Sequence, residues 1–79
     1  MRIQFSRHAK RRARLYKLPE SLIEQALLGA KLIEGENTIL TNMPGIIYPV
    51  KIVIVLENQT ATIITNYPMK KAHHNESSL

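Results

Sequence analysis

Between Ser6 and about Ala30 the apolar residues follow helical spacing, whereas the short segment before it and most of the chain beyond it have patterns typical of strands. Arg2–Phe5 alternates polar and apolar side chains, which predicts a short strand. Ser6 is a favourable N-cap, so a first helix is predicted from there to about Tyr16.

A second helix is predicted between Pro19 and about Ala30. Proline and an acidic residue are favourable in the first turn of a helix, and Pro19-Glu20 supplies both. Gly29 lies near the predicted end. The helix is amphipathic, with one apolar face made by Leu22, Ile23, Ala26, Leu27 and Ala30.

The rest of the chain predicts strands. Lys31–Glu34 and Thr38–Thr41 are predicted to be short strands joined by a hairpin across Gly35–Asn37. Val50–Leu56 is apolar on both faces, which predicts a central strand that is covered on both sides. Thr60–Tyr67 is predicted to return as its antiparallel partner.

These elements predict an α+β fold: β-α-α followed by a three- to four-stranded antiparallel sheet, with both helices on one sheet face. Residues 1–68 are predicted to form a single domain, and residues 69–79 a polar, flexible tail. A chain of 79 residues has a thin core, since small domains bury only about 60% of their unfolded surface. In addition to the apolar face of the second helix, the residues predicted to pack in the core are Ala9, Ala13, Tyr16, and either Val53 and Val55 or their neighbours on the opposite face.

Composition excludes several classes of chemistry. The chain has no Cys, so it has no disulfide, thiolate zinc site or cysteine nucleophile. It contains no glycine-rich phosphate loop and no serine-nucleophile motif, and His73-His74 lie in the predicted tail without other ligand types nearby. We therefore expect no cofactor and no metal site. No apolar run approaches the ~18 residues of a membrane span, so we expect a soluble, cytoplasmic protein without a membrane partner.

Positive charge is concentrated at the start of the chain. Residues 1–17 carry +7 with no acidic residue, residues 18–79 carry −2, and the whole chain carries +5. Such a basic block is typical of proteins that bind a polyanion, nucleic acid first, although a solvated helix face is an equal alternative on composition alone. The predicted nucleic-acid-binding residues on this face are Arg7, Lys10, Arg11 and Arg14.

Two basic residues lie off that solvent face. His8 and Arg12 are one helical turn apart and flank the apolar stripe, where their side chains can reach the rim of a sheet. A histidine can move protons near neutral pH, and a guanidinium binds phosphate oxygens in a bidentate manner. The alternative is a histidine with a local hydrogen bond beside an arginine whose stem covers apolar surface.

The last predicted strand adds two hydroxyl groups. Ile63, Thr65 and Tyr67 are predicted to share one face because side chains alternate along a strand. Tyr67 stands just before Pro68 and would present its hydroxyl at the sheet edge, although a packing role is the commoner use of such a tyrosine. If this strand lies under the first helix, His8, Arg12, Thr65 and Tyr67 can converge on one phosphate.

The string Phe5-Ser6-Arg7-His8-Ala9-Lys10-Arg11-Arg12-Ala13-Arg14 resembles the H-A-x-x-R opening of a group of small bacterial and archaeal domains. Further along, Leu18–Leu27, Lys31–Gly35, Val50–Leu56 and Ile63–Pro68 resemble the later segments of that group, so the resemblance covers residues 3–68. The group is similar in fold to the RelE/ParE toxin superfamily, which includes ribosome-dependent and free endoribonucleases and also proteins that are not nucleases.

The resemblance implies a metal-independent endoribonuclease in which the ribose 2′-OH attacks the adjacent phosphate. His8 and Arg12 match the helix motif of the group, and Thr65 and Tyr67 match its terminal strand motif. RNA, free or ribosome-bound, and an acidic antitoxin protein are the implied partners. Two other hypotheses stay open: a non-catalytic nucleic-acid-binding module, and a regulatory protein whose basic face holds an acidic partner.

Overall fold

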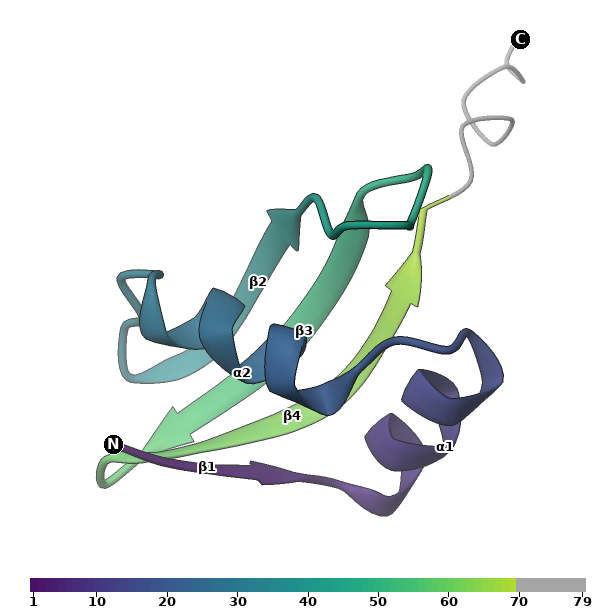
Figure 1. Ribbon diagram of the computed structural model, residues 1–79. Helices are drawn as coiled ribbons and strands as arrows, with labels where there is room; N and C mark the ends of the chain where they lie inside the picture. Colours follow the sequence, from purple (N-terminus) through teal and green to yellow (C-terminus); the bar gives the residue numbers. More distant parts are fainter. Residues whose placement is uncertain (70–79) are drawn as a thin grey trace, which may run out of the picture.

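Two helices and a four-stranded sheet make up residues 1–69, the part of the chain that the computed structural model describes (Figure 1). The elements follow one another as β1 (Arg2–Phe5), α1 (Arg7–Leu15), α2 (Glu20–Leu28), β2 (Gly35–Thr41), β3 (Val50–Glu57) and β4 (Thr60–Pro68). The α+β fold class is therefore confirmed. Residues 70–79 of the predicted tail lie outside the described residues.

Local sequence signals set the ends of both helices. The Ser6 side chain caps α1 by accepting a hydrogen bond from the Ala9 N–H at 3.0 Å. After α1, Lys17 adopts a left-handed φ of 56°, and the Leu18 N–H donates to the Ala13 carbonyl at 2.8 Å. Pro19 then precedes the first residue of α2, as the sequence predicts.

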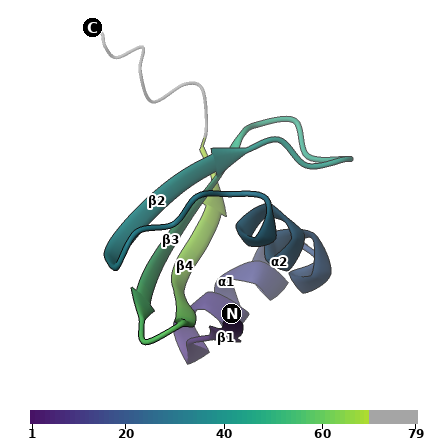
Figure 2. The same ribbon diagram turned by 90° about the vertical axis from the view of Figure 1, so that its left-hand side faces the viewer.

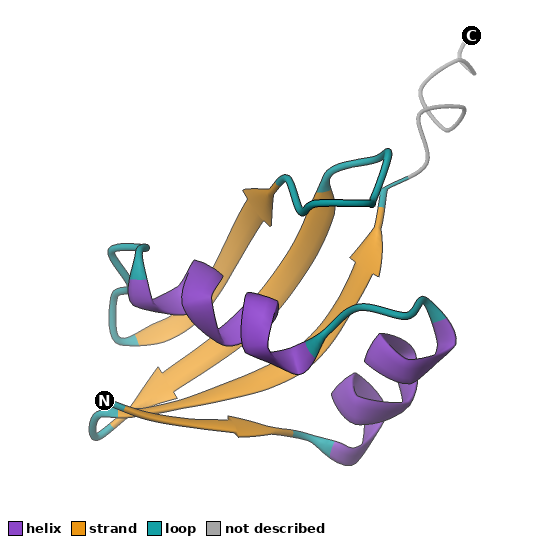
Figure 3. Cartoon of the chain, in the orientation of Figure 1, coloured by secondary structure: helices purple, strands orange, loops and turns teal. Residues whose placement is uncertain are grey.

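The sheet has the order β1-β4-β3-β2, and β2, β3 and β4 form an antiparallel meander. The expectation of a wholly antiparallel sheet is wrong, since β1 pairs with β4 in parallel. A parallel pair needs a long crossover between its strands, and here the two helices, β2 and β3 separate β1 from β4 along the chain. Figure 2 and Figure 3 show α2 across one face of the sheet, and Figure 3 shows α1 beyond the end of β1, beside β4.

The predicted strand at Lys31–Glu34 is not formed, and Gly35–Asn37 belongs to β2 instead of to a hairpin turn. A side chain explains the difference. The Asn37 amide accepts from the Ile33 N–H at 2.9 Å and donates to the Ile33 carbonyl at 2.8 Å. These bonds satisfy the backbone N–H and carbonyl of Ile33, just before β2, so that this residue needs no neighbouring strand.

The core lies between the helices and one face of the sheet. Ile52 and Ile54 are the inward residues of β3 and are fully buried, whereas Val53 and Val55 point to the other face and are half-buried. The prediction that this strand is covered on both sides is therefore wrong, because both helices serve one face. The buried apolar residues are Ala9, Ala13, Leu18, Ile23, Leu27, Met43, Val50, Ile52, Ile54, Ala61 and Ile63.

Both helices are nine residues long. Within residues 1–69, none has the length or the apolar character that crossing a bilayer would require.

Candidate nucleic-acid interface and catalytic residues

The first turn of α1 is held against β4 by three hydrogen bonds. The backbone N–H of Ser6 donates to the Ile63 carbonyl, and its hydroxyl donates to the Ile64 carbonyl, both at 3.0 Å. Further along, the Asn66 Nδ2 atom donates to the Ala9 carbonyl at 3.2 Å. Since Ala9 and Ala13 are buried, α1 lies close to β4 and turns its remaining surface outward.

That outward surface is cationic. The four residues predicted to bind nucleic acid, Arg7, Lys10, Arg11 and Arg14, are all exposed. The first turn of α1 contains no acidic residue, and the basic residues of its last turn are Arg12 and Arg14. A helix whose charged side chains are all basic presents positive charge to a partner.

Only one residue of the pair predicted to lie off this surface is partly covered in the structure. His8 is exposed, whereas Arg12 is half-buried. The Arg12 Nη1 atom lies 3.5 Å from the Tyr16 hydroxyl, one turn further along α1, and donates a long hydrogen bond to it. This contact leaves the other guanidinium donors of Arg12 available to a phosphate.

Thr65 and Tyr67 share a face of β4, as predicted, but Ile63 does not share it. The pairing of β4 with β3 skips Ile64, so that Ile63 pairs with Ile54 and Thr65 pairs with Val53. This β-bulge inserts one extra residue and reverses the alternation of side chains. Ile63 therefore faces the core, whereas Thr65 and Tyr67 lie on the face that no helix covers.

The structure brings α1 and β4 together without joining the four predicted catalytic side chains. Within residues 1–69, no hydrogen bond links His8 or Arg12 to Thr65 or Tyr67. The side chain of β4 that donates a hydrogen bond to α1 is that of Asn66, between the two hydroxyl-bearing residues. Convergence of the four side chains on one phosphate therefore stays a prediction.

Two residues of this region were not predicted from the sequence. Asn66 is fully buried beneath α1, and Lys51 pairs in register with Tyr67 on the uncovered sheet face. The buried position of Asn66 could have been inferred from Ile63-Ile64, because two successive apolar residues interrupt the alternation of a strand as a β-bulge does. The signal for Lys51 is its position as a lone charge within an apolar strand.

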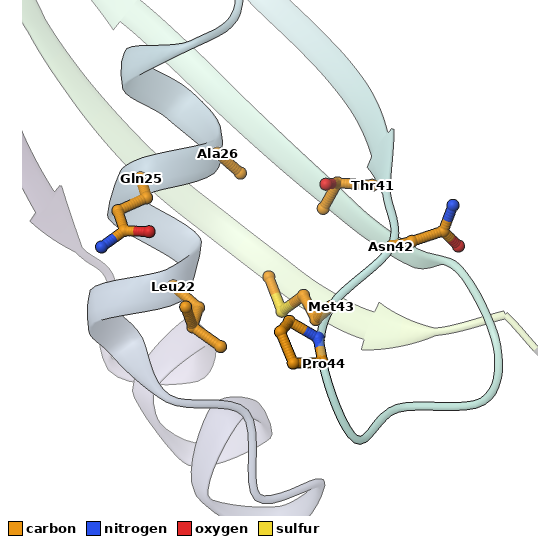
Figure 4. A pocket seen from close by; sticks show the side chains of 7 residues that line it. All are labelled: Leu22, Gln25, Ala26, Thr41, Asn42, Met43 and Pro44. Carbon is orange, nitrogen blue, oxygen red and sulfur yellow. The ribbon is translucent and has the colours of Figure 1, made fainter.

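A groove of about 300 Å³ lies elsewhere, between α2 and the segment that follows β2 (Figure 4). Its lining is uncharged and includes none of the predicted site residues; the residues are Leu22, Gln25, Ala26, Thr41, Asn42, Met43 and Pro44. It therefore supplies no titratable acid or base and no cationic side chain for a phosphate. The described residues also contain no group of three metal-ligating side chains, and His73-His74 lie outside them.

Comparison with known proteins assigns no family to the chain. No protein-family model, no curated protein and no solved structure matches it.

Proposed function

We propose that the protein is a small RNA-binding domain of the RelE/ParE type, in which α1 binds RNA phosphates and the domain cleaves the RNA without a metal ion. The exposed cationic surface of α1, made by Arg7, Lys10, Arg11 and Arg14, carries the proposal. A polyanion neutralises such a surface and releases counterions, which favours binding to any phosphate backbone.

The arrangement of these charges is unfavourable for the isolated helix. Arg7 and Arg11 are four residues apart, and so are Lys10 and Arg14, so each pair places like charges on neighbouring turns. Like-charge pairs at this spacing destabilise a helix. A surface that served only solubility would work as well with charges of mixed sign, so the cost supports a partner of opposite charge.

For cleavage, the 2′-oxygen of the ribose attacks the adjacent phosphorus and the bond from phosphorus to the 5′-oxygen breaks, leaving a cyclic phosphate. Arg12 binds the phosphate oxygens and stabilises the charge that develops on them. His8 accepts the proton of the 2′-hydroxyl or donates one to the leaving 5′-oxygen, and solvent water exchanges the other proton. Thr65 and Tyr67 donate hydrogen bonds to oxygens of the same group.

The second candidate is a non-catalytic module that binds RNA or an acidic antitoxin protein through the same surface. It is favoured by the lack of a hydrogen-bonded link between the α1 pair and the β4 pair within residues 1–69. Binding requires only the charge of α1, whereas cleavage requires His8 as well.

The deciding experiment incubates purified protein with RNA in EDTA, with and without ribosomes. Loss of His8 should lower cleavage by about 10²–10⁴-fold, since this is the usual contribution of general acid–base catalysis, while RNA affinity stays nearly unchanged. Arg12→Ala and Tyr67→Phe should also lower cleavage. Leu15→Ala is the matched control, because Leu15 is an exposed residue of the same helix.

Two results would contradict cleavage. One is the absence of product from the wild type under both conditions, and the other is equal product from the wild type, His8→Ala and the control. Either result, together with retained RNA binding, would leave the non-catalytic module. Absence of RNA binding in the wild type would remove both RNA proposals and leave the acidic protein partner.

A further inference from the structure

Asn66 is the buried polar residue of the described part of the chain, residues 1–69. Its Nδ2 atom donates to the Ala9 carbonyl at 3.2 Å, but its Oδ1 atom is buried without a hydrogen-bond partner. A buried acceptor that has given up water without a replacement lowers stability. Such a group in a folded protein calls for an explanation other than stability.

The fold does not need this amide to satisfy the helix. A carbonyl inside an α-helix accepts from the N–H four residues later, so the Ala9 carbonyl does not depend on Asn66. A leucine at position 66 has the same branched shape, with larger methyl groups in place of the amide, and would leave no buried polar atom unpaired. Hydrogen-bond satisfaction therefore favours an apolar residue at a position where the chain has asparagine.

The contact between α1 and β4 explains what the amide adds. The buried residues of α1 are Ala9 and Ala13, whose side chains are too small to interlock with the strand. Small residues allow close approach but define the rotation of a short helix about its axis only weakly. A directional hydrogen bond to the helix backbone defines that rotation.

The bulge at Ile64 connects this bond to the candidate catalytic residues. It turns Asn66 toward α1 while Thr65 and Tyr67 take the opposite face. The rotation of α1 on β4 in turn determines where its flank, with His8 and Arg12, stands relative to that face.

We infer that Asn66 is a positioning residue, whose bond to the Ala9 carbonyl fixes the rotation of α1 on β4 and thereby the placement of the His8–Arg12 pair relative to Thr65 and Tyr67. The geometric part of the inference stands on the contacts alone. Its consequence for cleavage rests on the proposed function.

The geometric part is tested by spin labels on α1 and on the far strand of the sheet. The chain has no Cys, so Arg14→Cys with Thr38→Cys gives two unique sites, both exposed. Pulsed electron paramagnetic resonance then measures the distance distribution between them. In the Asn66→Leu background we expect a broadened or shifted distribution, without a large fall in melting temperature relative to the doubly labelled parent.

Ile54→Val is the matched control. Ile54 is a fully buried residue of the same sheet face, and its truncation should lower the melting temperature while leaving the distance distribution unchanged. Asn66→Ala provides the same test as Asn66→Leu with a smaller side chain. An unchanged distribution in both Asn66 variants would overturn the inference, as would a large fall in melting temperature in both, which would make Asn66 a stability residue.

The consequence for cleavage is measured separately. If wild-type protein cleaves RNA, Asn66→Leu should lower the rate by about 10²-fold with little change in RNA affinity, since a misplacement of about 1 Å costs that much. An unchanged rate beside a shifted distribution would remove the link between Asn66 and catalysis. If wild-type protein does not cleave RNA, the catalytic proposal fails, and the distance measurement still decides the geometric part.

Discussion

At the scale of single residues, polar side chains form hydrogen bonds with backbone groups at several turns. Ser6 caps α1, Asn37 binds the backbone of Ile33, and the Glu34 carboxylate accepts from the Asn58 N–H at 3.2 Å. The backbone of the turn between β3 and β4 is less favourable. Asn58 and Gln59 both have left-handed φ values, 51° and 66°, a conformation that asparagine tolerates and glutamine does not favour.

Gln59→Gly should therefore stabilise the protein. Two-residue hairpin turns with positive φ at both positions favour Asn-Gly, and relief of the strained residue is worth about 1 kcal/mol. Urea unfolding followed by circular dichroism measures the gain. Gln59→Ala is the control, since alanine keeps the steric penalty and should bring no gain. A loss of stability in the glycine variant would contradict the strain argument.

At the scale of elements, α1 combines a small buried stripe with a large cationic surface. Its nine residues are too few for an isolated helix to be stable, so packing on β4 and the cap at Ser6 hold it. The charges of its outer surface do not contribute to that packing. They can be changed without loss of the core, which makes them testable apart from the fold.

Neutralising Lys10, Arg11 and Arg14 together should weaken RNA binding and flatten its salt dependence. Each lost phosphate contact removes about 0.7 from the slope of log affinity against log salt for a single strand. Fluorescence anisotropy of labelled RNA over a range of salt concentrations measures the slope. Lys31→Ala, an exposed lysine outside α1, should leave the slope unchanged. An unchanged slope in the triple variant would mean that the α1 surface only keeps the protein in solution.

At the scale of the whole molecule, one layer of apolar side chains between the helices and the sheet stabilises the domain. Ile54 of β3 lies in this layer, fully buried, with Ile63 of β4 and Asn37 of β2 as its neighbours in register. The side chains on the uncovered face of β3 and β4 are at most half-buried, and those of β2 on that face are exposed. A domain of this size has a small free energy of unfolding, because natural proteins gain only about 0.05–0.15 kcal/mol per residue on folding.

Ile54→Asp should consequently unfold the domain. An aspartate at this position has no partner of opposite charge among its neighbours, and burial of an unpaired charge costs more than the free energy of unfolding. Far-ultraviolet circular dichroism and thermal melting report the loss. Ile47→Asp makes the same substitution at a residue that is 88% exposed and should leave the melting transition in place. A cooperative melt in the Ile54 variant would contradict the position of the core.

Much of the fold could be predicted from local patterns. The two helices, the strands Arg2–Phe5, Val50–Leu56 and Thr60–Tyr67, and the Ser6 cap follow from spacing and capping preferences that act within a few residues. The positions of exposed charge on α1 follow from the same helical period. These features depend on neighbours in sequence, so the sequence by itself determined them.

Tertiary contacts decided the rest. The parallel pairing of β1 with β4, the longer β2 and the bulge at Ile64 depend on partners far away in the chain. The bulge alone moved Ile63 into the core, turned Asn66 under α1 and placed Thr65 and Tyr67 on the uncovered face. A one-residue shift in a strand reverses every later side chain, and its cost is set by the partner strand and the helix above it. That is why the pattern of the last strand predicted correctly that Thr65 and Tyr67 share a face, and incorrectly that Ile63 shares it with them.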